Sequence, residues 1–400
     1  MHGLEFPYEH SRLAIQEVQS TFNRVRRFAQ FLDKSSDPAT IESLCQSAFG
    51  YLENSLGILG FILRSTNVRN AFEFHGPMLR LTRLVLGPDA KLLLSSEWEI
   101  SPFLLLTAKV LPADYVLIGQ PASESSNPFL LPLAGHELGH SVWSKFQLRA
   151  NYDKSAKAEI SARLKKQWPA VKSLFDLTCK PEELENDLGG TAVLSMAVEL
   201  CCRQLEEAFC DCFGVRMFGT SYFYAFGYLL SPLASPVRSP IYPDFKDRAA
   251  DQVKAAQKFG YEEPDKYSDL FNASAPVTPG ADAFLLDIVD AIRKSMIDQI
   301  ILEVEKIANA SGLPTPSPIP TQNCVNTLKH FVPCLKASCL ADITNAAWQA
   351  RLAEPFFSKQ SLEKEKIRHL SELVLKSIEV FEIEQCLQDQ KNSATMGAQP

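Results

Sequence analysis

The chain has 400 residues, of which 46% are hydrophobic and 22% are charged, and its formal net charge is -7 at pH 7. This length exceeds one ordinary core and predicts two or three packed units. The acidic balance argues against a nucleic-acid partner, because proteins that bind nucleic acid usually concentrate basic residues.

Residues 1–88 are predicted to form an N-terminal helical unit. Three stretches carry apolar residues every three or four positions, which is the spacing of an amphipathic helix: 15–32, 41–63 and 72–86. Gly87-Pro88 ends this pattern, and short β-type runs at 91–107 and 115–118 then predict a small sheet.

Residues 89–260 are predicted to form a central unit that contains this sheet. Pro128 and Pro132 precede an apolar stretch, and since proline is tolerated in the first turn of a helix, a helix is expected over 130–147. A basic cluster follows from Lys154 to Lys172. Because it alternates with apolar residues, we interpret it as the solvated face of a helix, with a site for an acidic partner as the alternative.

A further apolar helical pattern runs from Thr191 to about Gly219. Residues 261–400 are predicted to form a C-terminal helical unit, with amphipathic helices over 285–307 and 367–381 and a Pro-rich linker or turn near 312–320. The predicted fold is therefore α+β and mainly helical, with a core that carries the small sheet and helical units at both ends.

The segment 135–140 reads GHELGH and contains the pattern HExxH. Its histidines, His136 and His140, are four residues apart, so on a helix both imidazoles lie on one face and can reach one metal ion. Glu137 is rotated from that direction by about 100°, toward the open side of the ion, where a water molecule would bind. The alternative is a pair of histidines hydrogen-bonded in the core.

A catalytic zinc ion normally has three protein ligands and one open position, so a third ligand must come from another segment. Glu207 and Asp211 lie four residues apart in the predicted helix 191–219. We expect Glu207 to bind the metal and Asp211 to accept a hydrogen bond from the non-ligating nitrogen of His136. Glu206 is the rival ligand.

Two further groups of residues, each containing cysteines, have side chains that can bind a metal. Cys210 and Cys212 point to different faces of one helix, so they cannot both reach one ion, and we expect both in the core. The second set lacks the spacing of a structural zinc site, and burial is again expected: Cys324, His330, Cys334 and Cys339.

With HExxH on one helix and ExxxD on a second, the sequence resembles the gluzincin zinc metallopeptidases over roughly residues 115–250. The resemblance implies a zincin-like catalytic domain in which Glu207 is the third Zn²⁺ ligand and Asp211 orients a ligand histidine. The interval of 66 residues between His140 and Glu207 is similar to that of peptidases related to the CAAX prenyl proteases.

Those peptidases carry His-Pro and then Arg after the glutamate helix. The corresponding residues here are Tyr242-Pro243 and Arg248, so tyrosine stands in the place of the histidine. No membrane span is expected either, because the most apolar stretches, 56–63 and 218–230, are shorter or more interrupted than the 20 or so apolar residues that a bilayer requires.

The resemblance implies a zinc-dependent metallopeptidase, an endopeptidase acting on a protein or peptide substrate. A metal-activated water would attack the peptide bond with Glu137 as general base. Tyr242 and Arg248 are the catalytic candidates for stabilising the oxyanion, and a peptide is expected to pair with an exposed strand around 114–118. Three other tyrosines are alternative donors: Tyr222, Tyr224 and Tyr228.

Two other functions remain open at this point. The chain could be a non-catalytic helical interaction protein with a structural or vestigial zinc site, although such a site has no use for Glu137. In addition, Arg69-Asn70 followed by His75 resembles the signature of the helical HEPN ribonucleases, without a basic groove beside it.

Localisation and redox state follow from weaker patterns. Residues 1–31 contain no basic segment followed by an apolar run, so no secretory signal is indicated and a cytoplasmic protein is expected. The ten cysteines follow no regular framework, which predicts reduced thiols rather than disulfides.

Overall fold

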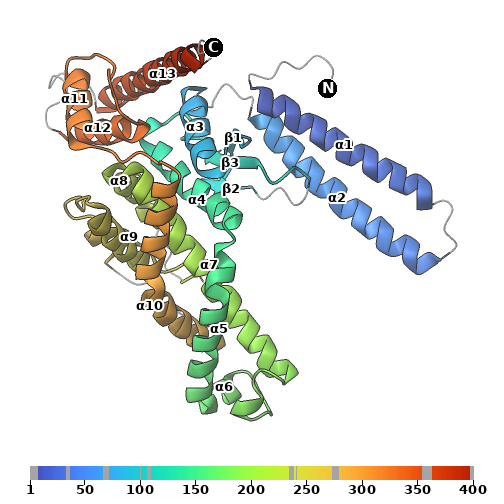
Figure 1. Cartoon of the computed structure of the whole chain (residues 1–400). Coiled ribbons are helices and arrows are strands. Elements are labelled where there is room, and N and C mark those ends of the chain that lie inside the picture. The colour runs from blue at the N-terminus through green and yellow to red at the C-terminus, as the bar shows by residue number, and fades with distance from the viewer. Residues whose placement is uncertain are drawn as a thin grey trace. The chain divides into compact units, whose positions relative to one another are not determined.

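The computed structural model of the chain is mainly helical and contains one three-stranded sheet, which confirms the predicted α+β, mainly helical fold class (Figure 1). The structure describes the following residues: 8–32, 37–65, 72–99, 101–105, 110–233, 238–239, 241–272, 279–353 and 363–396. The chain divides into two compact units. The first comprises 1–128, 330–335 and 360–400, and the second comprises 129–329 and 336–359.

The first unit combines helices with the sheet. Its elements are α1 (Glu9–Leu32), α2 (Pro38–Arg64), η1 (Phe72–Phe74), α3 (His75–Leu86), β1 (Lys91–Glu97), β2 (Phe103–Leu104), β3 (Tyr115–Pro121) and α13 (Glu363–Met396). Helices α1 and α2 run side by side in opposite directions (Figure 1). Strand β3 lies between β1, to which it is parallel, and β2, to which it is antiparallel.

This strand order corrects the prediction that the run around 114–118 is an exposed edge for a peptide. Both sides of β3 carry hydrogen-bonded neighbours, because Leu92 pairs with Val116 on one side and Leu104 pairs with Ile118 on the other. Residues 117–119 of β3 are therefore paired on both sides and cannot accept a further strand.

The sheet belongs with the N-terminal helices rather than with the segment that carries HExxH. Ile15 of α1 and Phe61 of α2 share one buried cluster with Leu93 of β1 and Leu117 of β3. Burial of each large apolar side chain contributes about 1.5–3 kcal/mol, so this shared core holds helices and sheet together. The observed division therefore differs from the predicted segments 1–88, 89–260 and 261–400.

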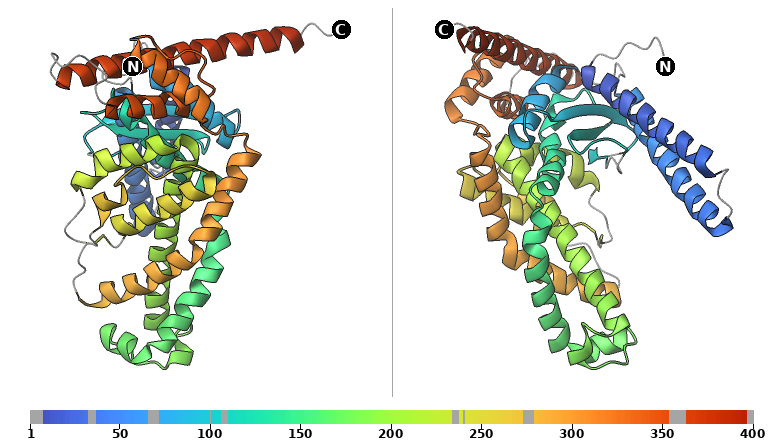
Figure 2. Two further views of the ribbon diagram at one scale, coloured as in Figure 1. Left: turned by 90° about the vertical axis from the view of Figure 1, so that its left-hand side faces the viewer. Right: turned by 45° about the vertical axis from the view of Figure 1, so that its right-hand side comes forward.

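In the described residues of the second unit, the regular secondary structure consists of helices alone. Its elements begin with η2 (Pro128–Leu133) and continue with α4 (Ala134–Lys145), α5 (Leu148–Lys166), α6 (Trp168–Leu174), η3 (Pro181–Glu183), α7 (Leu188–Phe218), α8 (Thr220–Leu230), η4 (Ser231–Leu233), α9 (Phe245–Phe259), η5 (Ser268–Phe271), α10 (Ala281–Ala310), α11 (Pro318–Lys329) and α12 (Leu340–Leu352). Helices α5, α7 and α10 lie alongside one another (Figure 2).

Helix α7 is the centre of the second unit and contacts α4, α5, α8, α9, α10 and α12. From Gln204 to Phe218 every residue is buried except the half-buried Glu206. A helix that is apolar on all sides must be covered on all sides, which explains this central position. It starts at Leu188, three residues before the predicted Thr191, because the Asp187 side chain caps it by accepting a hydrogen bond from the Gly190 amide at 2.9 Å.

Two other predicted segments have different bounds. The helix expected over 130–147 is a 3-10 turn, η2, followed by α4, because Pro132 has no amide to donate into a regular α-helix. The Pro-rich stretch 312–320 lies within the second unit, and its last residues already belong to α11. It is a turn between α10 and α11 rather than a linker between units.

Among the described residues, no helix is long and apolar enough to cross a membrane. All ten cysteines are free thiols.

Candidate metal centre

Helices α4 and α7 approach each other closely where α4 carries two glycines. A Cβ on Gly135 would lie 3.0 Å from the ring of Phe218, and a Cβ on Gly139 would lie 2.9 Å from the Cα of Cys210. Real side chains essentially never come this close to a backbone atom. The glycines therefore allow the HExxH helix to pack directly on α7, beside Glu207.

The two histidines and Glu207 face one another across this contact. The Nε2 atom of His136 lies 3.3 Å from Oε2 of Glu207, and the Nε2 atom of His140 lies 3.7 Å from Oε1 of the same carboxylate. The two imidazole rings are 5.0 Å apart and nearly perpendicular. Oε2 of Glu207 is buried and accepts no hydrogen bond from a described residue. The structure thus brings together the three side chains that the sequence predicted as metal ligands.

The opposite nitrogen of each histidine is bound to a carboxylate of α7. Nδ1 of His136 lies 2.9 Å from Oδ1 of Asp211, which is the contact expected from the sequence. Nδ1 of His140 lies 2.8 Å from Oε1 of Glu206. A carboxylate at Nδ1 favours the proton there and leaves the lone pair of Nε2 for a metal.

Glu206, which the sequence offered as an alternative third ligand, instead contacts Nδ1 of His140. Neighbouring residues of a helix point about 100° apart, so Glu206 and Glu207 cannot present their carboxylates in the same direction. Glu207 faces both Nε2 atoms, whereas Glu206 holds the far side of His140. The adjacent pair of glutamates was the signal in the sequence for this arrangement.

Asp211 is fully buried and is surrounded by donors. The guanidinium of Arg248 donates to both of its oxygens at 2.8 Å, and the hydroxyl of Tyr222 donates to Oδ1 at 2.8 Å. Burial alone would raise the pKa of Asp211, but Arg248 and His136 hold it far below its ordinary value. The carboxylate is therefore ionised and fixed behind His136.

These contacts give Arg248 and Tyr222 roles other than the predicted oxyanion donation. Both side chains are buried and are occupied by Asp211, and the Arg248 guanidinium also lies over the ring of Phe226 at 5.0 Å. Both residues therefore fix Asp211, which in turn contacts His136. Arg248 reaches Glu207 only at 3.8 Å.

The remaining tyrosine candidates lie in different surroundings. Tyr224 and Tyr228 pack on the ring of Trp348, at 5.4 and 6.2 Å between ring centroids. Tyr242 is half exposed, and burial together with the charges of Glu207 and Glu137 raises its pKa. Of these three tyrosines, Tyr242 is the one whose pKa responds to the charges of Glu207 and Glu137.

Glu137 and Glu207 are both buried but have opposite electrostatic shifts. Burial raises the pKa of Glu137, which suits a base that must accept a proton near neutral pH. Burial would also raise the pKa of Glu207, but its contact with His136 at 3.3 Å and the charge of Arg248 lower it. In turn, the carboxylates of Asp211 and Glu207 outweigh burial and raise the pKa of His136 to about 10.

Cys210 competes with Glu207 for the place of third ligand. Ligand atoms of His136, His140 and Cys210 lie within 4.8 Å of one another. However, burial and the surrounding carboxylates raise the pKa of the Cys210 thiol well above its ordinary value, and a thiol must lose its proton to bind a metal. Glu207 is ionised and faces both Nε2 atoms, whereas Cys210 packs against Gly139, so Glu207 and Cys210 are the two candidates for the third ligand.

The residues present fit a divalent metal ion. The imidazole of His136 lies between the buried carboxylates of Glu207 and Asp211, and its raised pKa shows that without a metal this pair of carboxylates holds a proton on His136. A divalent cation bound at Nε2 would take the place of that proton between the same two carboxylates. Two imidazole nitrogens and one carboxylate oxygen are also a ligand set of catalytic zinc sites.

The other predicted sites are not assembled in the described residues, where no further group of three or more histidines, cysteines or carboxylates could hold a metal. Cys212, Cys324, Cys334 and Cys339 are buried, as expected, whereas His330, which was also expected to be buried, is exposed. His75 is buried, stacks on Tyr8 and contacts the Leu92 carbonyl at 3.2 Å, which are the contacts of a core histidine. Arg69 and Asn70 lie outside the described residues.

Comparisons of the chain with protein families, with curated proteins and with solved structures find no match. Any functional assignment therefore rests on the residues of the site and on their geometry.

Proposed function

We propose that the chain is a zinc-dependent metallopeptidase of the gluzincin kind, with its catalytic centre on α4 and α7. The observation that carries the proposal is that both histidines turn Nε2 toward the buried carboxylate of Glu207 while a second carboxylate holds each Nδ1. A pair of histidines used only for packing would not need this arrangement on both nitrogens.

In this proposal His136, His140 and Glu207 hold Zn²⁺, which when bound supplies a Lewis acid that polarises a peptide carbonyl and activates water. Glu137 accepts the proton of the attacking water and passes it to the leaving amine. Tyr242 donates a hydrogen bond to the developing oxyanion. The substrate is a protein or peptide.

The residues behind the site act through the ligands. Asp211 fixes the orientation of His136, and Arg248 and Tyr222 fix Asp211. Glu206 does the same for His140. This support is expected to keep both imidazoles aimed at one point before the metal arrives, which favours tight binding.

The proposal is tested by comparing metal content with cleavage. The purified protein is expected to contain about one zinc per chain by elemental analysis and to cleave a mixed peptide library followed by mass spectrometry. His136→Ala should lose both zinc and cleavage. Glu137→Gln should keep zinc and lose cleavage, because only the base is removed.

His330→Ala, which changes an exposed histidine in the first unit, is the matched control and should change neither property. If Glu137→Gln cleaves peptides as fast as the parent, the proposed mechanism is wrong. A parent that holds zinc but cleaves no peptide would instead support a non-catalytic interaction protein with a structural zinc.

A further inference from the structure

A strongly basic stretch stands out in this acidic chain. Residues 154–172 contain six lysines or arginines and a single acidic residue, Glu159, whereas the whole chain has a net charge of -7. Helix α5 carries most of them, and it buries its other side through a stripe of four residues: Tyr152, Ala156, Ile160 and Leu164. The lysines therefore stand on the solvent side of α5.

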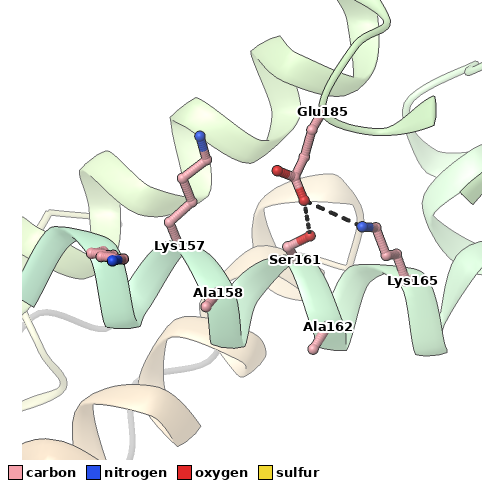
Figure 3. A pocket seen from close by; sticks show the side chains of 7 residues that line it. Lys157, Ala158, Ser161, Ala162, Lys165 and Glu185 are labelled. Atoms are coloured by element: carbon pink, nitrogen blue, oxygen red, sulfur yellow. Dashed lines mark hydrogen bonds and ion pairs between the residues drawn. The ribbon is translucent and has the colours of Figure 1, made fainter. Parts of the chain in front are cut away.

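A pocket of about 470 Å³ lies on this side of α5. Its lining residues are Lys154, Lys157, Ala158, Ser161, Ala162, Lys165 and Glu185. Figure 3 shows Lys157, Ser161 and Lys165 projecting from α5 on the side where Glu185 lies. The two alanines leave room between the longer side chains, so the lysines border a hollow. We call Lys154, Lys157, Ser161 and Lys165 the lysine face.

The single carboxylate of the pocket balances only one of its lysines. Oε1 of Glu185 accepts hydrogen bonds from the Ser161 hydroxyl at 2.8 Å and from Lys165 Nζ at 3.2 Å. Lys154 and Lys157 form no ion pair with any residue that the structure describes. Lys154 and Lys157 therefore have no direct ionic contact in the described part of the chain, and of the two only Lys157 also interacts with Glu185 through its charge at longer range.

We infer that the lysine face binds an acidic segment of a polypeptide, a run of Asp and Glu in an extended chain. From Lys154 to Lys165 the helix rises by about 16 Å, which is the length of roughly five residues of extended chain. Such a row of point charges matches carboxylates repeated along a backbone better than one compact phosphate. Lysine contributes a flexible point charge, which suits carboxylates of variable position.

Nucleic acid fits this surface less well. The pocket contains no arginine and no aromatic side chain on which a base could stack, and the rest of the chain is acidic. The inference is independent of the proposed peptidase activity, because the lysine face shares no residue with the metal centre.

The test measures fluorescence anisotropy of a labelled peptide of alternating Glu and Ser, with the corresponding Gln and Ser peptide as comparison. The Glu peptide should bind the parent, and added salt should weaken binding because the contacts are exposed charges. Lys154→Glu together with Lys157→Glu should weaken binding by about tenfold or more.

Lys258→Glu together with Lys329→Glu is the matched control, since it changes the charge of exposed residues of the same unit by the same amount. It should leave affinity within about twofold, and so should His136→Ala, which addresses the metal centre alone. The inference fails if the parent does not bind the Glu peptide, if the control weakens binding as much, or if inorganic phosphate or a single-stranded oligonucleotide binds the lysine face more tightly than the Glu peptide.

Discussion

At the scale of single residues, the spacing of four identified most of the candidate metal centre. His136 and His140 lie on one helical face wherever the helix packs, and the same holds for Glu207 and Asp211. The role of Glu206 was indicated only by its place next to Glu207, and the roles of Tyr222 and Arg248 could not be predicted from spacing. Tyr222 and Arg248 lie on α8 and α9, and only the packing of those helices on α7 brings them to Asp211.

Glu206 gives the first prediction at this scale. Glu206→Ala removes the acceptor at Nδ1 of His140, so the imidazole loses its fixed orientation and zinc affinity should fall by about 10–100-fold. Competition with a chromogenic chelator measures this change. Glu206→Gln should recover part of the affinity, since its amide oxygen still accepts a hydrogen bond.

Glu199→Gln is the control for Glu206, because it lies on the same helix but pairs with the exposed Arg149. Its zinc affinity should equal that of the parent. An unchanged affinity in Glu206→Ala would show that His140 does not depend on this contact.

Arg248 gives the second prediction. Arg248→Ala leaves the carboxylate of Asp211 buried without its charge partner, and breaking a buried ion pair from one side typically costs about 3–5 kcal/mol. The free energy of unfolding in urea should fall by that amount in protein kept free of metal. Removing both partners, in Arg248→Ala with Asp211→Ala, should cost less than the sum of the single changes. Simple additivity would mean that the two groups do not interact.

At the scale of secondary-structure elements, periodicity located the helices but not their neighbours. Helix α7 starts at Leu188 rather than at the predicted Thr191 because Asp187 caps it, and such a cap can be recognised from the local sequence. The order of the strands, in contrast, does not depend on a local signal. The apolar runs of β1 and β3 look alike, and no local feature of the sequence tells that β2 returns to make β3 the central strand.

The contact between α4 and α7 gives a prediction at this scale. A Cβ on Gly139 would lie 2.9 Å from the Cα of Cys210, so Gly139→Ala must push α4 away from α7. We expect a loss of about 1–3 kcal/mol in the free energy of unfolding and weaker zinc binding, because His140 moves from Glu207. Thermal unfolding and chelator competition measure the two effects.

The control for Gly139 is Gly57→Ala on α2, where nothing lies within 4 Å of an added Cβ. Alanine favours a helix over glycine by about 1 kcal/mol, so this substitution should stabilise the protein or leave it unchanged. Equal stability of Gly139→Ala and the parent would contradict the close approach of the two helices.

The packing of α3 against β1 gives a prediction about pH. Burial, assisted by the charges of His10 and Arg83, lowers the pKa of His75 to about 4, against an ordinary value of 6.5. The unfolded chain therefore takes up a proton first as the pH falls. Neutral His75 therefore contributes to the free energy of unfolding. This contribution is fully present above about pH 6.5 and is lost progressively toward pH 4, by at most about 3 kcal/mol.

Hydrogen exchange of peptides from α3 and β1 measures this loss locally. Protection should decrease between neutral pH and about pH 5, beyond the intrinsic effect of pH on exchange. His75→Gln, which can still donate to the Leu92 carbonyl, should reduce the decrease, whereas the exposed His369→Gln should not. A pH response that is the same in all three proteins would rule out His75 as its source.

At the scale of the whole molecule, the sequence predicted the fold class but not the division into units. The second unit joins α4 to helices more than a hundred residues later, and the first unit recruits α13 from the end of the described chain. Contacts between helices so far apart in the sequence depend on which apolar faces pack against each other. Periodicity identifies such a face but does not identify its partner.

Removal of the proposed metal gives the last prediction, because the proposed ligands join two helices of one unit. His136 and His140 come from α4 and Glu207 comes from α7, so a bound ion stabilises the second unit by its binding free energy, whereas the first unit contributes no ligand. A chelator should therefore increase hydrogen exchange in peptides of α4 and α7 and leave α1, α2 and the sheet unchanged. Zinc added back should restore protection. His136→Ala should exchange like the chelated parent with or without zinc, and if it still gains protection from zinc, the ion is bound elsewhere.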